Sequence, residues 1–471
     1  MKQTKTKNTA QSDLKPASYR QSSTSLTLGK SLWWLCSSQL MSRIVRLGSS
    51  VILARLLVPE VFGQVAIILT CFELICTPTR RISSAPLIAM SEHQYSQHLA
   101  AANRVNWIAC IVAFLLMSLI TWVVASYNAT PSLIAPMLCM ALSYLLLPFG
   151  MQYATQNLRA NKMRVVGRAA LWQTIVESVL SASLALAGVG IWAIVLPKLL
   201  VVSVWIMIHR HQNPLPNYKA SQATLNQTKK LLQFGLQVGF SDFSISLRQN
   251  IDYLIVGYFL GVEALGVYFF AVNASLGISL GVSQSFGTAF YSLLCKQKDQ
   301  RQSEQDSASH HPPAKSINRE KLIQFKQSTS IISLLTIPIV LLQAGLAPFY
   351  VPYIYGTQWV DAGALPVFVM LCLSGMVRPM GEAAGQLLIS EGKSHINLAI
   401  NISFTCLLAI TIALACQVSL LTVAQSIFVL YSICMPLICL YSYQNVRQEN
   451  FKRLPIQFVA LNQSNPSRSL R

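Results

Sequence analysis

The chain has 471 residues, of which 53% are hydrophobic and only 11% are charged. Because soluble proteins carry roughly 25% charged residues, this composition excludes a soluble enzyme, a secreted disulfide scaffold and a disordered regulator. The net charge of +20 does not indicate nucleic-acid binding, since the Lys and Arg residues gather in both tails and in short loops between apolar segments, which is typical of membrane orientation.

Apolar runs long enough to cross a bilayer, about 20 residues each, follow one another along most of the chain. We therefore predict an all-α polytopic membrane protein with about twelve transmembrane helices. The predicted spans are 31–57, 61–79, 105–126, 132–156, 169–187, 189–209, 231–258, 263–294, 327–350, 363–389, 394–416 and 419–442.

Loop charge predicts the orientation of these spans. The odd-numbered connections contain no Lys or Arg, whereas the even-numbered ones contain bases such as Arg80, Arg81, Lys162 and Lys393. Positive loops normally stay on the cytoplasmic side, which predicts that both termini are cytoplasmic. The connections on the opposite side are too short for a catalytic loop.

A short repeat predicts two similar halves. Residues 57–65 and 260–268 share the pattern L-x-x-E-x-[FL]-G-x-[VY], each in the turn between the first and second span of a six-helix half. Glu60 and Glu263 could cap the helix that follows, and Gly63 and Gly266 would allow close packing there. Two six-helix lobes around a central cavity are typical of a transporter.

The expected organisation has five parts. They are a basic cytoplasmic tail (1–30), an N-terminal lobe (31–209), a cytoplasmic linker (210–230), a C-terminal lobe (231–442) containing a polar cytoplasmic loop (295–326), and a second basic tail (443–471).

Charged residues within the spans are the candidate functional groups, because a charge near the bilayer centre costs at least about 2.5–3.5 kcal/mol unless it faces a cavity or a partner. The bases are Arg43, Arg46, Lys198, Arg248 and Arg378, and the acids are Glu73, Glu177, Asp242, Asp252 and Glu382.

Two interpretations of these charges remain open. Arg248 with Asp252, and Arg378 with Glu382, have the (i, i+4) spacing of ion pairs within one helix. Arg43 and Arg46 have no acid within one turn, which favours a cationic, water-filled cavity for phosphate or acidic sugar. The acids Glu73, Glu177, Asp242 and Asp252 are candidates for coupling to a cation or proton. Arg55 and Arg104 lie near span ends, where snorkelling to the interface is expected.

Motifs of other chemistry are missing from the sequence. It contains no phosphate-cradling glycine loop, no H-E-x-x-H metalloprotease motif and no C-x-x-C pair. We therefore expect a transporter rather than an enzyme, with no cofactor, no metal site and no nucleotide-driven step.

Three segments resemble a known family. GSSVILARLLVPEVFGQVAI (48–67), NIDYLIVGYFLGVEALGVYFFA (250–271) and YGTQWVDAGALPVFVMLCLSGMVRPMG (355–381) are similar to segments of the polysaccharide transporter (Wzx-like) family of the multidrug/oligosaccharidyl-lipid/polysaccharide (MOP) superfamily. The order of the segments and the number of spans fit this family over residues 30–442.

The resemblance implies a flippase of the bacterial cytoplasmic membrane. Such a protein moves oligosaccharide units linked to undecaprenyl pyrophosphate from the inner to the outer leaflet, by alternating access, for O-antigen, capsule or exopolysaccharide. The resemblance implies that Arg43 and Arg46 lie in the cavity. Asp252, in the N-x-D-Y pattern of the family, could have either a structural role or a role in coupling. The resemblance does not explain loop 295–326 or the tails. The implied partners are the lipid-linked oligosaccharide, the bilayer, and as candidates a polysaccharide polymerase and chain-length proteins, with no nucleic acid.

Two alternatives to a flippase remain. One is a cation-coupled multidrug exporter of the same superfamily, for which a carboxylate-lined cavity is expected. The other is a membrane polysaccharide polymerase or ligase, against which the short outer loops count. The unpaired arginines favour an anionic substrate and therefore the flippase.

Overall fold

The computed structural model describes residues 37–38, 41–90, 92–128, 131–160, 162–211, 225–305, 314–391 and 393–452, and these form helices joined by short turns. Residues 41–56 form the first long helix. The others are α2 (Pro59–Ala89), α3 (Glu92–Asn128), the 3-10 helix η1 (Pro131–Leu133), α4 (Ile134–Leu146), α5 (Pro148–Arg159), α6 (Met163–Leu186), α7 (Trp192–His211), α8 (Leu225–Gln305), α9 (Ala314–Tyr355), α10 (Gln358–Asp361), α11 (Ala364–Ser374), α12 (Arg378–Ser390), α13 (Ser394–Ala415) and α14 (Leu420–Lys452).

The helices match the predicted spans in number and order. In the described part of the chain, nine helices are long and apolar enough to cross a membrane, and the bent pair α4–α5 makes ten. One of the nine, over residues 225–277, includes parts of both arms of α8. The helix at 41–56 completes the set of twelve. The predicted tail 1–30 lies outside the residues described, as do residues 212–224 of the linker, 306–313 of the polar loop and 453–471 of the second tail.

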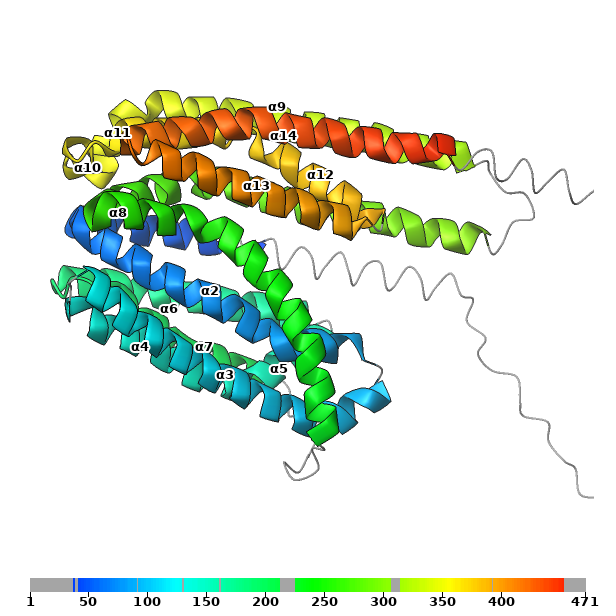
Figure 1. The fold of residues 1–471 in the computed structure, drawn as a ribbon, viewed down its shortest axis with the longest axis horizontal. Helices are drawn as coiled ribbons and strands as arrows, with labels where there is room; N and C mark the ends of the chain where they lie inside the picture. Colours follow the sequence, from blue (N-terminus) through cyan, green and yellow to red (C-terminus); the bar gives the residue numbers. More distant parts are fainter. Residues whose placement is uncertain are drawn as a thin grey trace, which may run out of the picture.

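Three helices are interrupted where the sequence supplies a local cause. Gly261 has φ 84° and ψ 179°, a conformation that favours glycine, and here α8 turns back to form two arms, 225–260 and 262–305 (Figure 1). α4 and α5 meet at 54° just before Pro148, which lacks a backbone donor. Pro379 likewise stands at the start of α12, so that Arg378 lies beside a break within the predicted tenth span.

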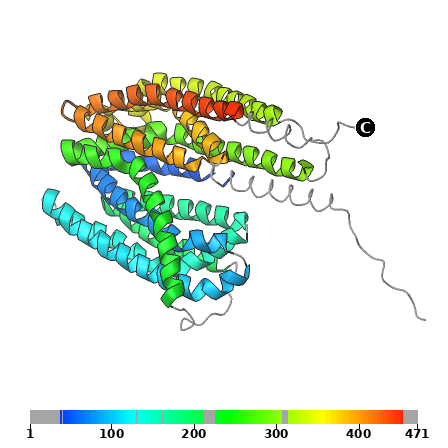
Figure 2. The same cartoon turned by 45° about the vertical axis from the view of Figure 1, so that its right-hand side comes forward.

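The helices form two groups with α8 between them (Figures 1 and 2). Helices α2–α7 make up the N-terminal lobe, and α9–α14 with the second arm of α8 make up the C-terminal lobe. The first arm of α8 crosses back onto the N-terminal lobe, where it packs against α2 and α3. A side chain at Gly235 would overlap the backbone of Ile82, so the two helices are in backbone contact there.

The lobes touch at the end that carries the repeated turns. A methyl group at Gly63 would overlap the backbone of Val262, and one at Gly266 would overlap the backbone of Pro59. The two copies of the repeat therefore pack reciprocally against each other. We call this region the closed end of the molecule.

Side chains strengthen the closed end. The Trp359 indole is fully buried and donates to the Ala54 carbonyl at 2.8 Å, and its ring stacks on Phe270 at 3.9 Å. Arg55 donates through Nε to the Ile354 carbonyl at 2.7 Å, at the end of α9. Arg55 therefore joins the helix at 41–56 to the end of α9.

The capping role expected for Glu60 is not observed. α2 begins at Pro59 with Val58 as its N-cap residue, and no side chain caps it. Glu60 lies one residue inside the helix, too late to cap it, and accepts from Gln64 at 3.4 Å. Its charge still complements the positive helix end. Glu263 occupies the corresponding place two residues after Gly261.

Candidate substrate cavity between the lobes

A cavity of about 860 Å³ lies between the lobes. Its walls come from the helix at 41–56, α2, α6 and α7 on one side, and from α8, α12, α13 and α14 on the other. It begins beneath the closed end, near Phe62 and Leu53, and extends along the helices towards Arg46 and Ile389. Its charged lining residues are Arg46, Lys198, Arg248, Arg378, Glu73, Glu177, Asp252 and Glu382.

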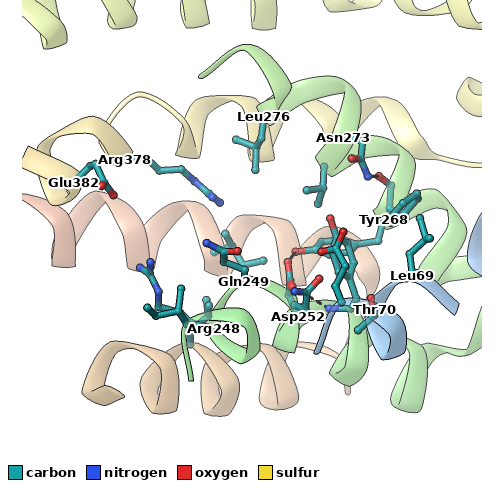
Figure 3. A pocket seen from close by; sticks show the side chains of 18 of the residues that line it. Leu69, Thr70, Arg248, Gln249, Asp252, Tyr268, Asn273, Leu276, Arg378 and Glu382 are labelled. Atoms are coloured by element: carbon teal, nitrogen blue, oxygen red, sulfur yellow. Dashed lines mark hydrogen bonds between the residues drawn. The ribbon is translucent and has the colours of Figure 1, made fainter. Parts of the chain in front are cut away.

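Three of the four bases form no direct ion pair. Within the described part of the chain, Arg46, Arg248 and Arg378 form no ion pair. The Nε atoms of Arg248 and Arg378 are buried without a hydrogen-bond partner, and the Arg378 guanidinium carbon lies 4.2 Å from the centroid of the Tyr431 ring. Figure 3 shows Arg248 on α8 and Arg378 on α12 extending into the same space.

The (i, i+4) ion pairs that the sequence allows are absent from this region. Both oxygens of Asp252 are engaged elsewhere, one by the Tyr268 hydroxyl at 2.9 Å and the other by the Tyr253 backbone N–H at 3.0 Å. Glu382 accepts instead from Gln386 at 2.9 Å. Neutral donors thus engage both oxygens of Asp252 and one oxygen of Glu382, and neither carboxylate pairs with an arginine.

Two other ion pairs form between helices. Lys198 on α7 lies 2.8 Å from Glu177 on α6 in the cavity wall, each side chain about a quarter exposed. Arg81 on α2 lies 3.1 Å from Asp242 on α8, outside the cavity lining. Glu73 is the one coupling candidate in the cavity lining that is exposed.

Arg43 lies outside the cavity lining. It reaches across to the second arm of α8, where its guanidinium donates to the Gly277 carbonyl at 2.6 Å. A methyl group at Gly281 would overlap this guanidinium. Arg43 therefore ties the helix at 41–56 to α8, whereas Arg46, one turn further along, faces the cavity.

The structure also brings polar residues to the cavity that the sequence analysis did not select. They are Gln386 on α12, Asn397 and Asn401 on α13, and Tyr431 on α14. The signal was present as polar residues four apart in otherwise apolar spans, at Glu382 and Gln386 and again at Asn397 and Asn401.

A family model decides the relationship. The model described as "Polysaccharide biosynthesis protein" matches residues 52–311, more than half of the chain. The chain belongs to this family. Members are Wzx-like, so the family resemblance expected from the three sequence segments is confirmed. The protein is a multi-pass membrane protein.

Named bacterial relatives are distant. This chain is 21% identical to the teichuronic acid biosynthesis protein TuaB of Bacillus subtilis (strain 168), over 70% of this chain and 64% of that protein. It is also 21% identical to the lipopolysaccharide biosynthesis protein WzxC of Escherichia coli (strain K12), over 66% of this chain and 59% of that one. The match thus spans less than two thirds of either relative.

Solved structures share the fold. The lipid II flippase MurJ in an inward closed conformation superposes with a TM-score of 0.68 at 11% identity, covering 92% of this chain and 93% of that one. An inward-facing multidrug resistance transporter of the MATE family gives 0.65 at 12% identity, covering 88% and 96%. This fold has 12 transmembrane helices in two lobes, so the predicted fold class is confirmed.

Proposed function

We propose that this protein is a flippase that moves oligosaccharide units linked to undecaprenyl pyrophosphate from the inner to the outer leaflet of the bacterial cytoplasmic membrane. The observation that supports this most is the set of three cavity arginines, Arg46, Arg248 and Arg378, that form no ion pair with any described residue. A diphosphate is the charged part of such a lipid, and guanidinium groups bind its oxygens in a bidentate manner.

The cavity accounts for how a charged headgroup could cross. Arginines without a partner are costly within a membrane unless water or an anion compensates them. A diphosphate that enters the cavity gains these charges while its lipid tail stays in the bilayer. Opening at alternate ends would then release it on the other side, and the closed end at Gly63 and Gly266 is one of the two positions that such a cycle requires.

The other groups have narrower proposed roles. Lys198 is engaged by Glu177, so we assign the pair to the structure of the N-terminal lobe rather than to the diphosphate. Glu73, exposed in the cavity, is our candidate for coupling to a cation or proton. We further propose that both termini are cytoplasmic, on the pattern of loop charge.

A deletion strain tests the proposal. We expect surface polysaccharide to be lost and complete lipid-linked repeat units to accumulate on the cytoplasmic leaflet. Arg248→Ala should reproduce the defect at normal protein level, while Arg168→Ala, which removes an exposed arginine outside the cavity lining, should complement fully. Accumulation of single units on the outer leaflet would indicate a polymerase or ligase and refute the flippase.

The multidrug-exporter alternative has less support. It needs cavity carboxylates that can meet a cationic drug, but Asp252 and Glu177 are already engaged by protein donors, which leaves Glu73 and one oxygen of Glu382. A purified-protein binding assay with a cationic dye would test it. Binding that Glu73→Gln abolishes and Arg248→Ala leaves unchanged would favour an exporter.

A further inference from the structure

The C-terminal wall of the cavity carries a cluster of polar side chains next to an aromatic pair. Glu382 and Gln386 lie one turn apart on α12, and Asn397 and Asn401 lie one turn apart on α13. We call these four residues the amide wall. All are partly buried and line the cavity.

The amide wall has unused hydrogen-bonding capacity. The side-chain amide of Asn397 makes no hydrogen bond within the described part of the chain. Its backbone carbonyl accepts from the Asn401 side-chain amide at 2.8 Å, and its backbone N–H donates to the Lys393 carbonyl. Gln386 uses one donor on Glu382, which leaves its carbonyl oxygen available. The wall thus offers both donors and acceptors to a ligand.

The opposite wall differs in this respect. Ser50 donates to the Leu47 carbonyl at 2.8 Å, and Ser49 makes hydrogen bonds to the Arg46 carbonyl and to Ser178. The donors of these two hydroxyls are therefore already taken by the protein. The hydroxyl and amide groups of a ligand find more open partners on α12 and α13.

Two glycines on α12 let neighbouring side chains pack closely against its backbone. A methyl group at Gly385 would lie 3.1 Å from Oδ1 of Asn397, and one at Gly381 would overlap the Met435 side chain. Beyond them, Phe404 and Tyr431 meet edge to face with their centroids 5.1 Å apart. Aromatic surface beside amide and carboxylate groups suits a sugar ring, which has apolar faces and hydroxyl edges.

Charge is divided within this part of the cavity. Arg378 begins α12 and Glu382 follows four residues later, a rise of about 6 Å along a helix. Among the lining residues that the structure describes, α13 and α14 contribute no Lys or Arg. A ligand group bound at Arg378 would therefore place the part of the ligand attached to it against the amide wall, in which the one charged side chain, Glu382, is negative.

We propose that the amide wall binds the saccharide of the lipid-linked substrate and selects a neutral sugar over an acidic one. The proposal rests on the flippase function and makes it more specific. Amides would bind sugar hydroxyls or an acetamido group, and Glu382 would accept from hydroxyls while repelling a uronic acid carboxylate. The arginines would remain with the diphosphate.

The test measures binding of three lipids to the purified full-length protein in nanodiscs. They are undecaprenyl diphosphate alone, the same lipid with a neutral disaccharide, and the same lipid with a uronic acid as the second sugar. We expect the wild-type protein to bind the neutral form about tenfold more tightly than the acidic one. Asn397→Leu should weaken the neutral form about three- to tenfold, the loss of one or two neutral hydrogen bonds.

Glu382→Gln should remove the discrimination between neutral and acidic sugars, because it keeps the shape but not the charge. Unchanged binding of the sugar-free lipid shows that each variant is folded, and Thr411→Val, on α13 outside the cavity lining, is the matched control. If Asn397→Leu and Glu382→Gln bind all three lipids as the wild type does, the amide wall is not a sugar site. If the wild type fails to bind the sugar-free lipid, or if Arg378→Ala binds that lipid as tightly as the wild type does, the flippase proposal itself fails.

Discussion

Gly63→Ala is predicted to open the closed end of the molecule. The added methyl group would lie 2.8 Å from the carbonyl carbon of Val262 and would overlap its oxygen. Because carbon atoms pack at about 3.5–4.0 Å, the two backbones must separate by at least about 0.7 Å. Both are main chain held in helices, so no side-chain rotation can relieve the overlap.

The energetic effect follows from the same geometry. Overpacking of this kind typically costs about 1–3 kcal/mol, and here the cost falls only on the state in which the lobes touch. The ratio of closed to open protein should therefore fall by about 5- to 150-fold. Gly48→Ala on the helix at 41–56 is the control, since a methyl group there meets nothing within 4 Å.

Electron paramagnetic resonance distances measure the outcome. Spin labels at Val189, in the turn between α6 and α7, and at Val418, in the turn between α13 and α14, report on the two lobes in a background without native cysteines. Both positions are exposed. We expect Gly63→Ala to lengthen the distance or add a longer one. A distribution identical to that of Gly48→Ala would refute the reasoning.

Further predictions concern the cavity and the closed end. Arg46→Ala should abolish surface polymer at normal protein level, whereas Arg168→Ala should not; polymer at wild-type amount in the first variant would remove Arg46 from the site. Lys198→Met should lower the free energy of unfolding by about 1–3 kcal/mol, between the values for surface and buried ion pairs, and adding Glu177→Gln should restore part of this loss. Thermal unfolding of the single and double variants measures both effects. Strictly additive effects would contradict the ion pair. Trp359→Phe, which removes the indole donor but keeps most of the ring, should destabilise the closed end by about 1 kcal/mol, seen as a lower unfolding midpoint, and no change would mean that this hydrogen bond contributes nothing.

The fold could be predicted because a bilayer imposes length and apolarity on every span. Each of the twelve apolar runs has a helical counterpart, and the two repeated turns lie where the pattern put them. The breaks within two of these spans were not predicted, although Pro148 and Pro379 stand at helix starts. Spacing alone predicted continuous spans because it says nothing about where a proline bends a helix.

The partners of charged residues could not be predicted in the same way. Spacing within one helix paired Arg248 with Asp252, but the acid is bound by Tyr268 from the other arm of α8. Likewise Arg43 and Arg46 lie about one turn apart on the same helix, yet Arg43 donates to the Gly277 carbonyl and only Arg46 lines the cavity. The neighbour that packs against one face of a helix changes along the length of the helix. Tertiary packing, not spacing within the helix, determines that neighbour.

The placement of the cavity arginines on three different helices suggests how binding could depend on conformation. Arg46 belongs to the helix at 41–56, whereas Arg248 and Arg378 belong to α8 and α12. If rocking of the lobes moved one arginine from about 6 to about 10 Å from a phosphate charge, their attraction would weaken by about 1 kcal/mol at an effective dielectric constant near 20. Two phosphate charges would about double the effect, so that affinity would fall by more than tenfold without any titration. Opening and release would then be one event, an account that fails if undecaprenyl diphosphate binds equally well to the wild type and to Gly63→Ala.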